Sequence, residues 1–406
     1  MDGRRRGLRQ PDLRGLSPVS LQQAVRLHGR IAEVGREAWD ACAGAPAHAG
    51  NPFIRFDFLD SLEASACAVE RTGWGPQHLT VDDEQGRVAA VMPLYLKSHS
   101  QGEYIFDHSW ADAYERAGGR YYPKLLCASP FTPATGARLL VRPDVDVEEA
   151  RTVLLGGALS VCQKLGASSL HVNFPREDEW RWMGERGLAR REGQQYHWRN
   201  DGYASFDDFL SALSSGRRKT IRRERREAQA GLEIVCLTGA DLTEAHWDAF
   251  FAFYMDTGSR KWGRPYLNRR FFSLLGERMA ERVLLVMARR GGRWIAGALN
   301  LMGEDCLYGR NWGCVEDVPF LHFELCYYQA IEWAIGRGLA RVEAGAQGEH
   351  KIARGYLPSP VYSAHYIADP ALRGPVEAFV ERERAGVEAE MEWLAEEYSP
   401  FRQEPD

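Results

Sequence analysis

One pattern of apolar and polar residues occurs twice in this sequence and limits the folds that the chain can adopt. Residues 79–91 and 285–297 each place a polar turn, ending in Gly86-Arg87 and Gly292-Arg293, between two apolar runs. This spacing predicts a β-hairpin in each half of the chain. Around both hairpins the periodicity predicts the same order of elements: helix, hairpin, strand, helix, strand. Because five elements recur in one order, we predict a duplicated α/β unit.

The periodicity also gives the bounds of the expected elements. In the first half they are residues 56–66, 78–95, 104–110, 149–165 and 168–174. In the second half they are residues 245–256, 283–302, 304–312, 323–336 and 340–344. We therefore expect an N-terminal arm with a helix near residues 21–42, two α/β domains and an acidic C-terminal helix, with the bounds 1–50, 51–203, 204–370 and 371–406.

The composition is that of a globular chain. Of the 406 residues, 45% are hydrophobic and 26% are charged, which is enough for two or three packed cores. No apolar run approaches the roughly 20 residues of a membrane-spanning helix, and no apolar segment follows the arginine-rich start as in a signal peptide. The eight cysteines form no C-x-x-C pair and no zinc-type spacing. We expect a cytoplasmic protein without membrane insertion, with reduced core cysteines and no metal.

Charge is distributed unevenly along the chain. The net charge of −5 does not favour binding to DNA, yet residues 217–226 contain seven cations and a single acid, Glu224. Two interpretations of this run stay open. It is either a solvated helix or a site for phosphates, because so many cations repel one another unless an anion lies nearby. In the second interpretation the contacts with donor phosphates or tRNA come from Arg217, Arg218, Lys219, Arg222 and Arg223.

Residues able to carry chemistry are densest between positions 308 and 356. Polar and aromatic residues gather there where a predicted strand ends and a helix begins, and again after the next strand, and open α/β sheets bind ligands at such edges. The candidate residues are Arg310, Asn311, Trp312, His322, Glu324, Tyr327, Gln347, Glu349, His350, Lys351 and Arg354. The run Glu349-His350-Lys351 offers two bases and a cation between glycines. The competing interpretation is a buried ion network without chemistry.

The first half has a polar cluster of its own. On a strand, Glu103, Ile105 and Asp107 share one face, which presents two carboxylates to a groove between the halves. The candidate substrate-binding residues of this half are His99, Glu103, Asp107, Trp110, Tyr121 and Lys124. The competing interpretation is an edge strand with solvated acids.

The motifs of both clusters resemble a bacterial family of predicted N-acyltransferases, described as peptidoglycan biosynthesis or recognition proteins. They include Asn51-Pro-Phe, Tyr95–Asp107, Tyr121–Leu126, Pro130–Gly136, Leu321–Gln329 and Gly345–Gly355. This family is similar to the GCN5-related acetyltransferases in the duplicated form of the Fem-type aminoacyl transferases. The resemblance implies an α/β (α+β) fold with two tandem acetyltransferase-like domains, whose mixed central sheets are flanked by helices. It also implies amide formation on an amine.

The resemblance also bears on the acyl donor. Coenzyme A-dependent relatives carry a glycine-rich loop after the fourth strand, whose N–H groups bind pyrophosphate. Here the corresponding stretch, Val315–Glu324, is acidic and lacks glycine. Fem-type enzymes take aminoacyl-tRNA and have a lysine shortly before a Gly-aromatic pair, an arrangement that Lys351 and Gly355-Tyr356 resemble. The basic run would then contact the tRNA backbone.

We therefore expect an enzyme that transfers an aminoacyl or acyl group from an activated donor, aminoacyl-tRNA, to a primary amine of a small molecule, peptide or cell-wall precursor. Glu349, His350 or Glu324 would take the proton of the amine, and Lys351 would stabilise the oxyanion. No tightly bound cofactor is expected. The alternatives are transfer from acyl-CoA or an acyl carrier protein, and a protein that binds a ligand without catalysis.

Overall fold

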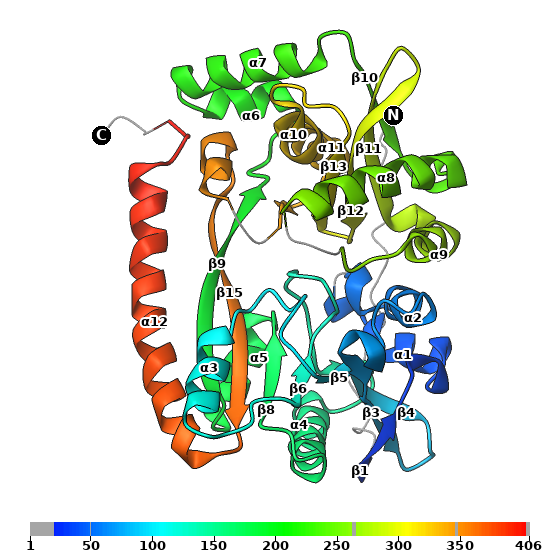
Figure 1. Cartoon of the computed structure of the whole chain (residues 1–406), viewed down its shortest axis with the longest axis vertical. Helices are drawn as coiled ribbons and strands as arrows, with labels where there is room; N and C mark the ends of the chain where they lie inside the picture. The colour runs from blue at the N-terminus through cyan, green and yellow to red at the C-terminus, as the bar shows by residue number, and fades with distance from the viewer. Residues whose placement is uncertain (1–19, 49, 262–264, 346–347, 403–406) are drawn as a thin grey trace, which may run out of the picture.

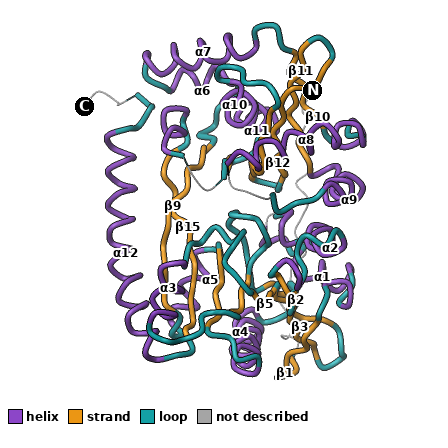
Figure 2. The backbone as a smooth tube through the Cα atoms, viewed as in Figure 1, coloured by secondary structure: helices purple, strands orange, loops and turns teal. Residues whose placement is uncertain are grey.

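The computed structural model describes residues 20–48, 50–261, 265–345 and 348–402. In Figure 1 the first half of the chain forms the lower part of the molecule and the second half the upper part. The long helix α12 (Pro370–Glu397) runs along one side of both parts. In Figure 2 two strands, β9 (Ala189–Arg199) and β15 (Leu357–Ile367), extend side by side through the middle and join the two parts.

Within its described residues, the first half combines strands of two sheets with five α-helices. Its strands before β9 are β1 (Leu21–His28), β2 (Trp74–Pro76), β3 (His78–Asp83), β4 (Val88–Met92), β5 (Leu94–Lys97), β6 (Lys124–Cys127), β7 (Leu140–Val141) and β8 (Ser169–Asn173). Four of them form a separate sheet with the order β1-β3-β4-β7. Its helices are α1 (Arg36–Ala43), α2 (Phe56–Ala64), α3 (His108–Arg116), α4 (Val147–Lys164) and α5 (Glu177–Glu185).

The second half continues with an antiparallel series of strands covered by helices. Its remaining strands are β10 (Glu233–Leu237), β11 (Val283–Arg290), β12 (Arg293–Met302), β13 (Cys306–Cys314) and β14 (Arg341–Glu343). Its helices before α12 are α6 (Phe206–Ala212), α7 (Ser215–Gln229), α8 (Glu244–Lys261), α9 (Arg269–Met279), α10 (Leu321–Phe323), the π-helical turn η7 (Glu324–Tyr328), α11 (Gln329–Arg337) and the 3-10 segment η8 (Glu349–Arg354).

Both halves contribute to one eleven-stranded sheet with the order β10-β11-β12-β13-β14-β9-β15-β8-β6-β5-β2. Strand β9, at the end of the first half, lies between β14 and β15, and β15, at the end of the second half, lies between β9 and β8. In each half one parallel pair, β6 with β8 and β13 with β14, follows the antiparallel strands. The last strand of each half therefore completes the sheet of the other.

Local sequence signals explain where several helices begin. The Asp146 carboxylate accepts the N–H of Glu149 at the start of α4, and the Ser205 hydroxyl accepts the N–H of Asp208 at the start of α6. These contacts satisfy N–H groups that have no partner within the helix. The hairpin between β3 and β4 turns at Gly86, whose φ of 77° suits glycine.

Aromatic packing also joins the two halves, in addition to the paired strands. The ring of Phe53 meets that of Tyr308 edge to face at a centroid distance of 5.0 Å, and Phe58 meets Phe271 at 6.0 Å. One hydrophobic cluster therefore contains residues of α2 together with residues of α9 and β13. Burying such large side chains favours a fixed arrangement of the two parts.

Most of the predicted elements are confirmed by the structure. The helices expected at 56–66, 149–165 and 245–256 correspond to α2, α4 and α8, both hairpins form, and the basic run and the acidic C-terminus are helical. The eight cysteines, all within the described residues, form no disulfide and lie at buried or half-buried positions. Among the described residues, no helix is both long and apolar enough to cross a membrane.

Two predicted elements are wrong. The helix expected near residues 21–42 is instead β1, which pairs with β3, followed by α1. The strand expected at 104–110 is a loop followed by α3, because Tyr104 has a φ of 60° and Lys124 draws Glu103 and Asp107 inward. In both places long-range contacts override the local pattern.

Candidate active site

Lys351 is the buried cation of the second-half cluster. It lies in η8, after the loop that follows β14, and it is 2% exposed. Its Nζ donates a hydrogen bond of 3.0 Å to the carbonyl O of Gly345. Burial lowers the pKa of Lys351 to about 8, against the opposing effect of Cys326. The ammonium group is therefore mostly protonated at pH 7 and lies at the carboxyl end of a sheet strand.

His350 and Tyr327 form a hydrogen-bonded pair next to Lys351. His350 is exposed, and its Nε2 lies 2.9 Å from the hydroxyl of Tyr327. Tyr327 belongs to the π-helical turn η7, a rare conformation that is frequent at functional sites. The ring of His322 lies 5.3 Å from that of Tyr327 and 5.2 Å from that of Trp312. Four predicted site residues from three segments thus meet in one cluster.

Arg354 anchors the segment that carries these groups. Its Nη1 donates to the carbonyl O of His350 at 2.7 Å, and its guanidinium carbon lies 3.4 Å from the ring centroid of Phe323. Its Nη2 forms an ion pair of 2.8 Å with Glu224 of α7. Arg354 is 8% exposed, so its charge is compensated within the protein.

The three predicted bases lie in different environments. Glu324 is fully buried, and its carboxylate accepts hydrogen bonds from Arg225 at 3.0 Å, Gln229 at 2.9 Å and Gln329 at 2.7 Å. Glu349 is exposed at the start of η8. Gln347, the remaining residue predicted in this loop, lies outside the described residues. His350 therefore combines access to solvent with a fixed hydrogen-bond partner.

Arg310 and Asn311 lie on β13 where the halves meet. Arg310 donates to the carbonyl O of Phe131, and its guanidinium carbon lies 5.5 Å from the ring centroid of Phe53. Both partners belong to the first half. Asn311 lines a small cavity between the halves together with Phe131 and Phe271. These two predicted residues therefore connect the halves.

The predicted carboxylates of the first half meet at a lysine. Lys124 is fully buried, and its Nζ donates to Ser100 Oγ at 2.7 Å, to Glu103 Oε2 at 2.9 Å and to Asp107 Oδ2. The hydroxyl of Tyr121 donates to the same Asp107 oxygen at 2.7 Å. Four predicted residues are thus brought together, although they are buried and bonded to one another.

Burial and charge act in opposite directions in this Lys124 cluster. Burial raises the pKa of Glu103 to about 7, against the attraction of Lys124. Burial also disfavours the charged form of Asp107, but Lys124 holds its pKa below the usual range. A second lysine, Lys97, is buried over the ring of Trp74 at 3.6 Å, and burial lowers its pKa to about 7. The cluster therefore contains groups that change charge near neutral pH.

The two other predicted residues of the first half flank this cluster. Trp110 of α3 is 4% exposed, and its ring meets the ring of His365 at 4.9 Å. His99 lies in the loop after β5, where its Nε2 is 3.1 Å from the carbonyl O of Thr72. The side chain of Trp110 is therefore part of the core, while His99 is half-buried at the surface.

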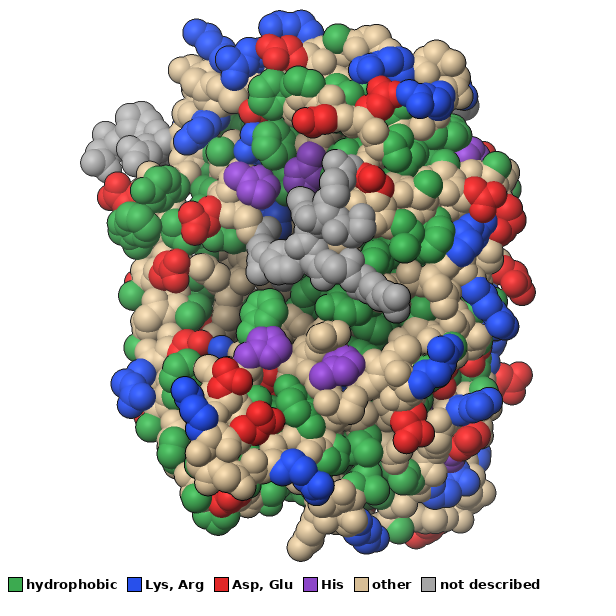
Figure 3. All heavy atoms as spheres, in the orientation of Figure 1, with side chains coloured by type: hydrophobic (Ala, Val, Ile, Leu, Met, Phe, Trp, Pro, Cys, Tyr) green, Lys and Arg blue, Asp and Glu red, His purple; other side chains and the backbone are tan. Residues whose placement is uncertain are grey.

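Helix α7 carries the basic run, with an outer face of cations. Arg217, Lys219, Arg222 and Arg223 are exposed, and Arg218 is half-buried. In Figure 3, Lys and Arg side chains gather at the upper end of the molecule over α7, and histidines lie on both sides of the middle of the same face. The phosphate-binding interpretation thus has an accessible surface.

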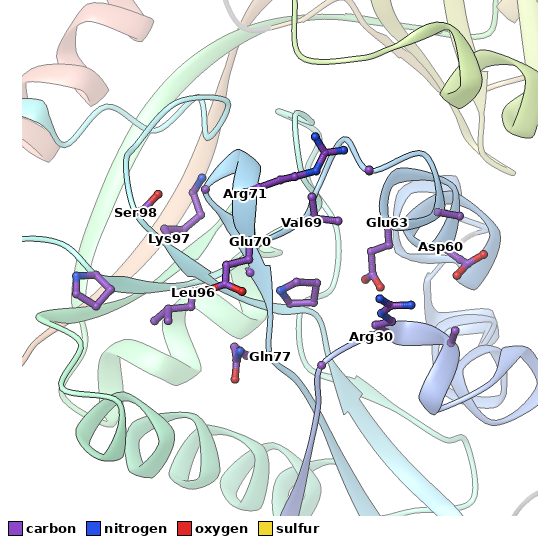
Figure 4. Close-up of a pocket in the computed structure, with 18 residues that line it drawn as sticks. Arg30, Asp60, Glu63, Val69, Glu70, Arg71, Gln77, Leu96, Lys97 and Ser98 are labelled. Atoms are coloured by element: carbon purple, nitrogen blue, oxygen red, sulfur yellow. The ribbon is translucent and has the colours of Figure 1, made fainter.

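One cavity lies in the first half, away from the Lys351 cluster. It has a volume of about 940 Å³ and lies between α2 and the strands β2 and β5. Figure 4 shows Arg30, Asp60 and Glu63 on one side and Leu96, Lys97 and Ser98 on the other. Glu63 lies 2.7 Å from His78 and Asp60 lies 2.6 Å from Arg278, so both of these acids have a partner within the protein. Among the described residues, no group of His, Cys, Asp and Glu is arranged to hold a metal ion.

Several residues around both clusters were missing from the sequence-based candidates. Glu224 was counted there only as the acid within a basic run, and His171 and His365 lie alone within apolar strands. The spacing of Ile221, Glu224 and Ala228 marks an inward helix face and could have identified Glu224. No local signal pairs two histidines that are far apart in the chain.

The fold is similar to that of several solved structures. Among solved structures, FemX aligns with a TM-score of 0.52 and 13% identity, over 87% of this chain and 99% of that one. The C-terminal domain of a putative lysylphosphatidylglycerol synthetase from Agrobacterium fabrum aligns with a TM-score of 0.50 and 11% identity, over 86% and 97% of the two chains. A tandem GNAT protein from the clavulanic acid biosynthesis pathway aligns with a TM-score of 0.47 and 12% identity, over 86% and 99%.

The likenesses to FemX and to the synthetase domain confirm the predicted fold of two tandem acetyltransferase-like units. No curated protein matches the sequence. A family model described as peptidoglycan biosynthesis/recognition matches residues 30–403. The chain therefore belongs to the FemAB-like family of peptidoglycan biosynthesis/recognition proteins.

Proposed function

We propose that this protein is an N-acyltransferase that moves an aminoacyl group from aminoacyl-tRNA to a primary amine of a peptide, small molecule or cell-wall precursor. The observation that carries the proposal is the position of Lys351, a buried cation with a pKa of about 8 at the carboxyl end of β14. A fixed cation in a water-poor environment stabilises the oxyanion that forms when an amine attacks an ester carbonyl.

His350 is the base in this proposal. In the reaction the amine nitrogen attacks the ester carbonyl, the C–N bond forms and the ester C–O bond breaks. The base takes the proton that the amine loses and returns it to the departing ribose oxygen, which leaves as a hydroxyl. His350 is exposed and its Nε2 is held by the Tyr327 hydroxyl at 2.9 Å, so the ring is oriented and accessible. Glu324 is less suited to this role, because its carboxylate is fully buried and bonded to Arg225.

Two features support tRNA as the donor. The outer face of α7 is basic and accessible, as phosphate contacts require. The segment after β13, where a coenzyme A pyrophosphate would need free N–H groups, is acidic, and its Glu316 pairs with Arg290 at 2.8 Å. The family description supports a cell-wall precursor as the acceptor. With such substrates the protein would act in the cytoplasm.

The test is transfer by the purified protein from a radiolabelled pool of charged tRNA to a panel of peptide and amino-sugar amines, with acetyl-CoA as the parallel donor. We expect label in an amide product with tRNA only. His350→Asn should lower the rate by about a hundredfold or more, whereas Glu349→Gln should leave it nearly unchanged.

The other outcomes point to the alternatives. Product from acetyl-CoA would make the protein an acyl-CoA enzyme. Product from neither donor, together with tight binding of an acceptor, would make it a ligand-binding protein.

A further inference from the structure

Glu224 is the single acid of the basic run, and it faces inward. On α7 the residues Ile221, Glu224 and Ala228 are 1%, 4% and 0% exposed. Spacings of three and four residues place them on one face of the helix. The exposed cations Arg217, Lys219 and others lie on the outer face. Helix α7 therefore presents several cations to solvent and the Glu224 carboxylate to the protein interior, where Arg225 of the same helix also pairs with Glu324.

This carboxylate contacts both segments of the candidate active site. Its Oε1 accepts from Arg354 Nη2 at 2.8 Å and its Oε2 accepts from the same nitrogen at 3.1 Å. The hydroxyl of Tyr328 also donates to Oε2. Arg354 belongs to η8, which carries His350 and Lys351, and Tyr328 follows Tyr327 in η7.

Arg354 connects Glu224 to the candidate base, His350, by hydrogen bonds to both residues. Its Nη1 donates to the carbonyl O of His350 at 2.7 Å while its Nη2 is held by Glu224. Separating a buried ion pair leaves two charges without compensation, so α7 and η8 move together rather than apart. A shift of α7 would therefore change the positions of His350 and Lys351.

We propose that Glu224 is a positioning residue that couples the docking of a polyanion on the outer face of α7 to the geometry of His350 and Lys351. The proposal depends on the proposed function in one respect, because it takes α7 as the surface that meets the tRNA backbone. Its consequence is that a bound RNA helix changes the environment of Lys351 without touching it.

The experiment measures the reactivity of Lys351 directly, without an activity assay. The full chain is acetylated with trace acetic anhydride, and the labelling rate of Lys351 is followed by mass spectrometry with and without a blunt-ended RNA duplex. The duplex offers phosphates but has no single-stranded 3′ end that could enter the site. We expect it to change the labelling rate in the wild-type protein by about fivefold, a typical size for coupled sites. In Glu224→Gln the change should disappear although the duplex still binds.

Two further variants complete the comparison. Glu227→Gln, on the same helix, alters an exposed acid 3.8 Å from Arg223 and should keep the full response. Tyr328→Phe removes one donor to Glu224 and keeps its ion pair with Arg354, so it should reduce the response of Lys351 to the duplex without abolishing it. This variant tests the coupling if Glu224→Gln does not fold.

An equal response in wild type and Glu224→Gln, or no response in wild type with the duplex bound, would overturn the coupling and leave the proposed function intact. Absence of duplex binding would overturn both the coupling and the choice of tRNA as donor.

Discussion

His171 of β8 and His365 of β15 stand opposite each other in the sheet, with their Nδ1 atoms 2.6 Å apart. One ring must donate and the other accept, so at least one of the two is neutral in the native protein. Both are buried, and burial lowers the pKa of His171 to about 3 and that of His365 well below its usual range. The pair joins a strand of the first half to a strand of the second.

The His171 pair predicts a loss of stability in acid. In the unfolded chain a histidine has a pKa of about 6.5, so below that pH the unfolded state binds more protons than the native state. The free energy of unfolding should therefore fall as the pH drops, by about 2 kcal/mol between pH 7 and pH 5 for His171 alone. Urea titrations at both pH values should show a smaller fall in His171→Gln, and the exposed His108→Gln serves as control. An equal fall in the free energy of unfolding of the wild type, His171→Gln and His108→Gln would contradict a role for His171 in the acid sensitivity.

The pKa of Lys351 predicts how the transfer rate changes at alkaline pH. If its cation stabilises the oxyanion, the transfer rate should decrease above a pH of about 8, where the amine loses its proton. Lys351→Met should lower the rate by about a hundredfold or more and abolish that limb. Lys351→Arg keeps the charge and should remove the limb while retaining part of the rate. A rate that rises through pH 8 would instead identify Lys351 as a base.

Lys124 predicts a large effect on stability. Replacing it with methionine leaves Glu103 and Asp107 buried without their cation, which should cost about 3 to 5 kcal/mol of the free energy of unfolding. Chemical denaturation measures this loss. Lys219→Met, on the exposed face of α7, should change stability by less than about 0.5 kcal/mol. If Lys124→Met were as stable as that control, the Lys124 cluster would not be structural.

The outer face of α7 predicts a salt-dependent interaction with RNA. Removing Arg217, Lys219 and Arg223 together should reduce the slope of log affinity against log salt by about 2 to 3. Fluorescence anisotropy with a labelled RNA duplex over a range of salt concentrations gives the slope. Arg181→Ala, an exposed change on α5, is the control. An unchanged slope in the triple variant would show that RNA binds elsewhere.

Much of the fold follows from patterns within the sequence. The two hairpins and helices such as α2 and α4 have apolar spacings and turn residues that agree with their final structure. Leu21–His28 differs, because its partner β3 lies far along the chain and decides its conformation. The same holds for residues 104–110, where Lys124 turns two acids inward. The spacing of apolar residues indicates the secondary structure that a segment prefers locally, but it contains no information on partners that lie far along the chain.

The sequence predicts which residues form the candidate site better than it predicts the contacts between them. Lys351, His350 and Tyr327 stand in segments rich in polar and aromatic residues, and the structure brings these segments together. Glu324 stands in the same stretch, yet its carboxylate is occupied by Arg225. Which carboxylate meets a cation depends on the packing of α7, a relationship that the sequence alone does not reveal.

The exchange of strands between the halves has a mechanical consequence. Strands β9 and β15 are paired from Leu357 with His197 to His365 with Ala189. Strand β9 of the first half also pairs with β14 of the second, and β15 of the second half pairs with β8 of the first. The two parts are therefore joined by two hydrogen-bonded strands. A relative movement of the parts would have to bend both strands together. We therefore expect a stiffer connection than a single extended strand would give.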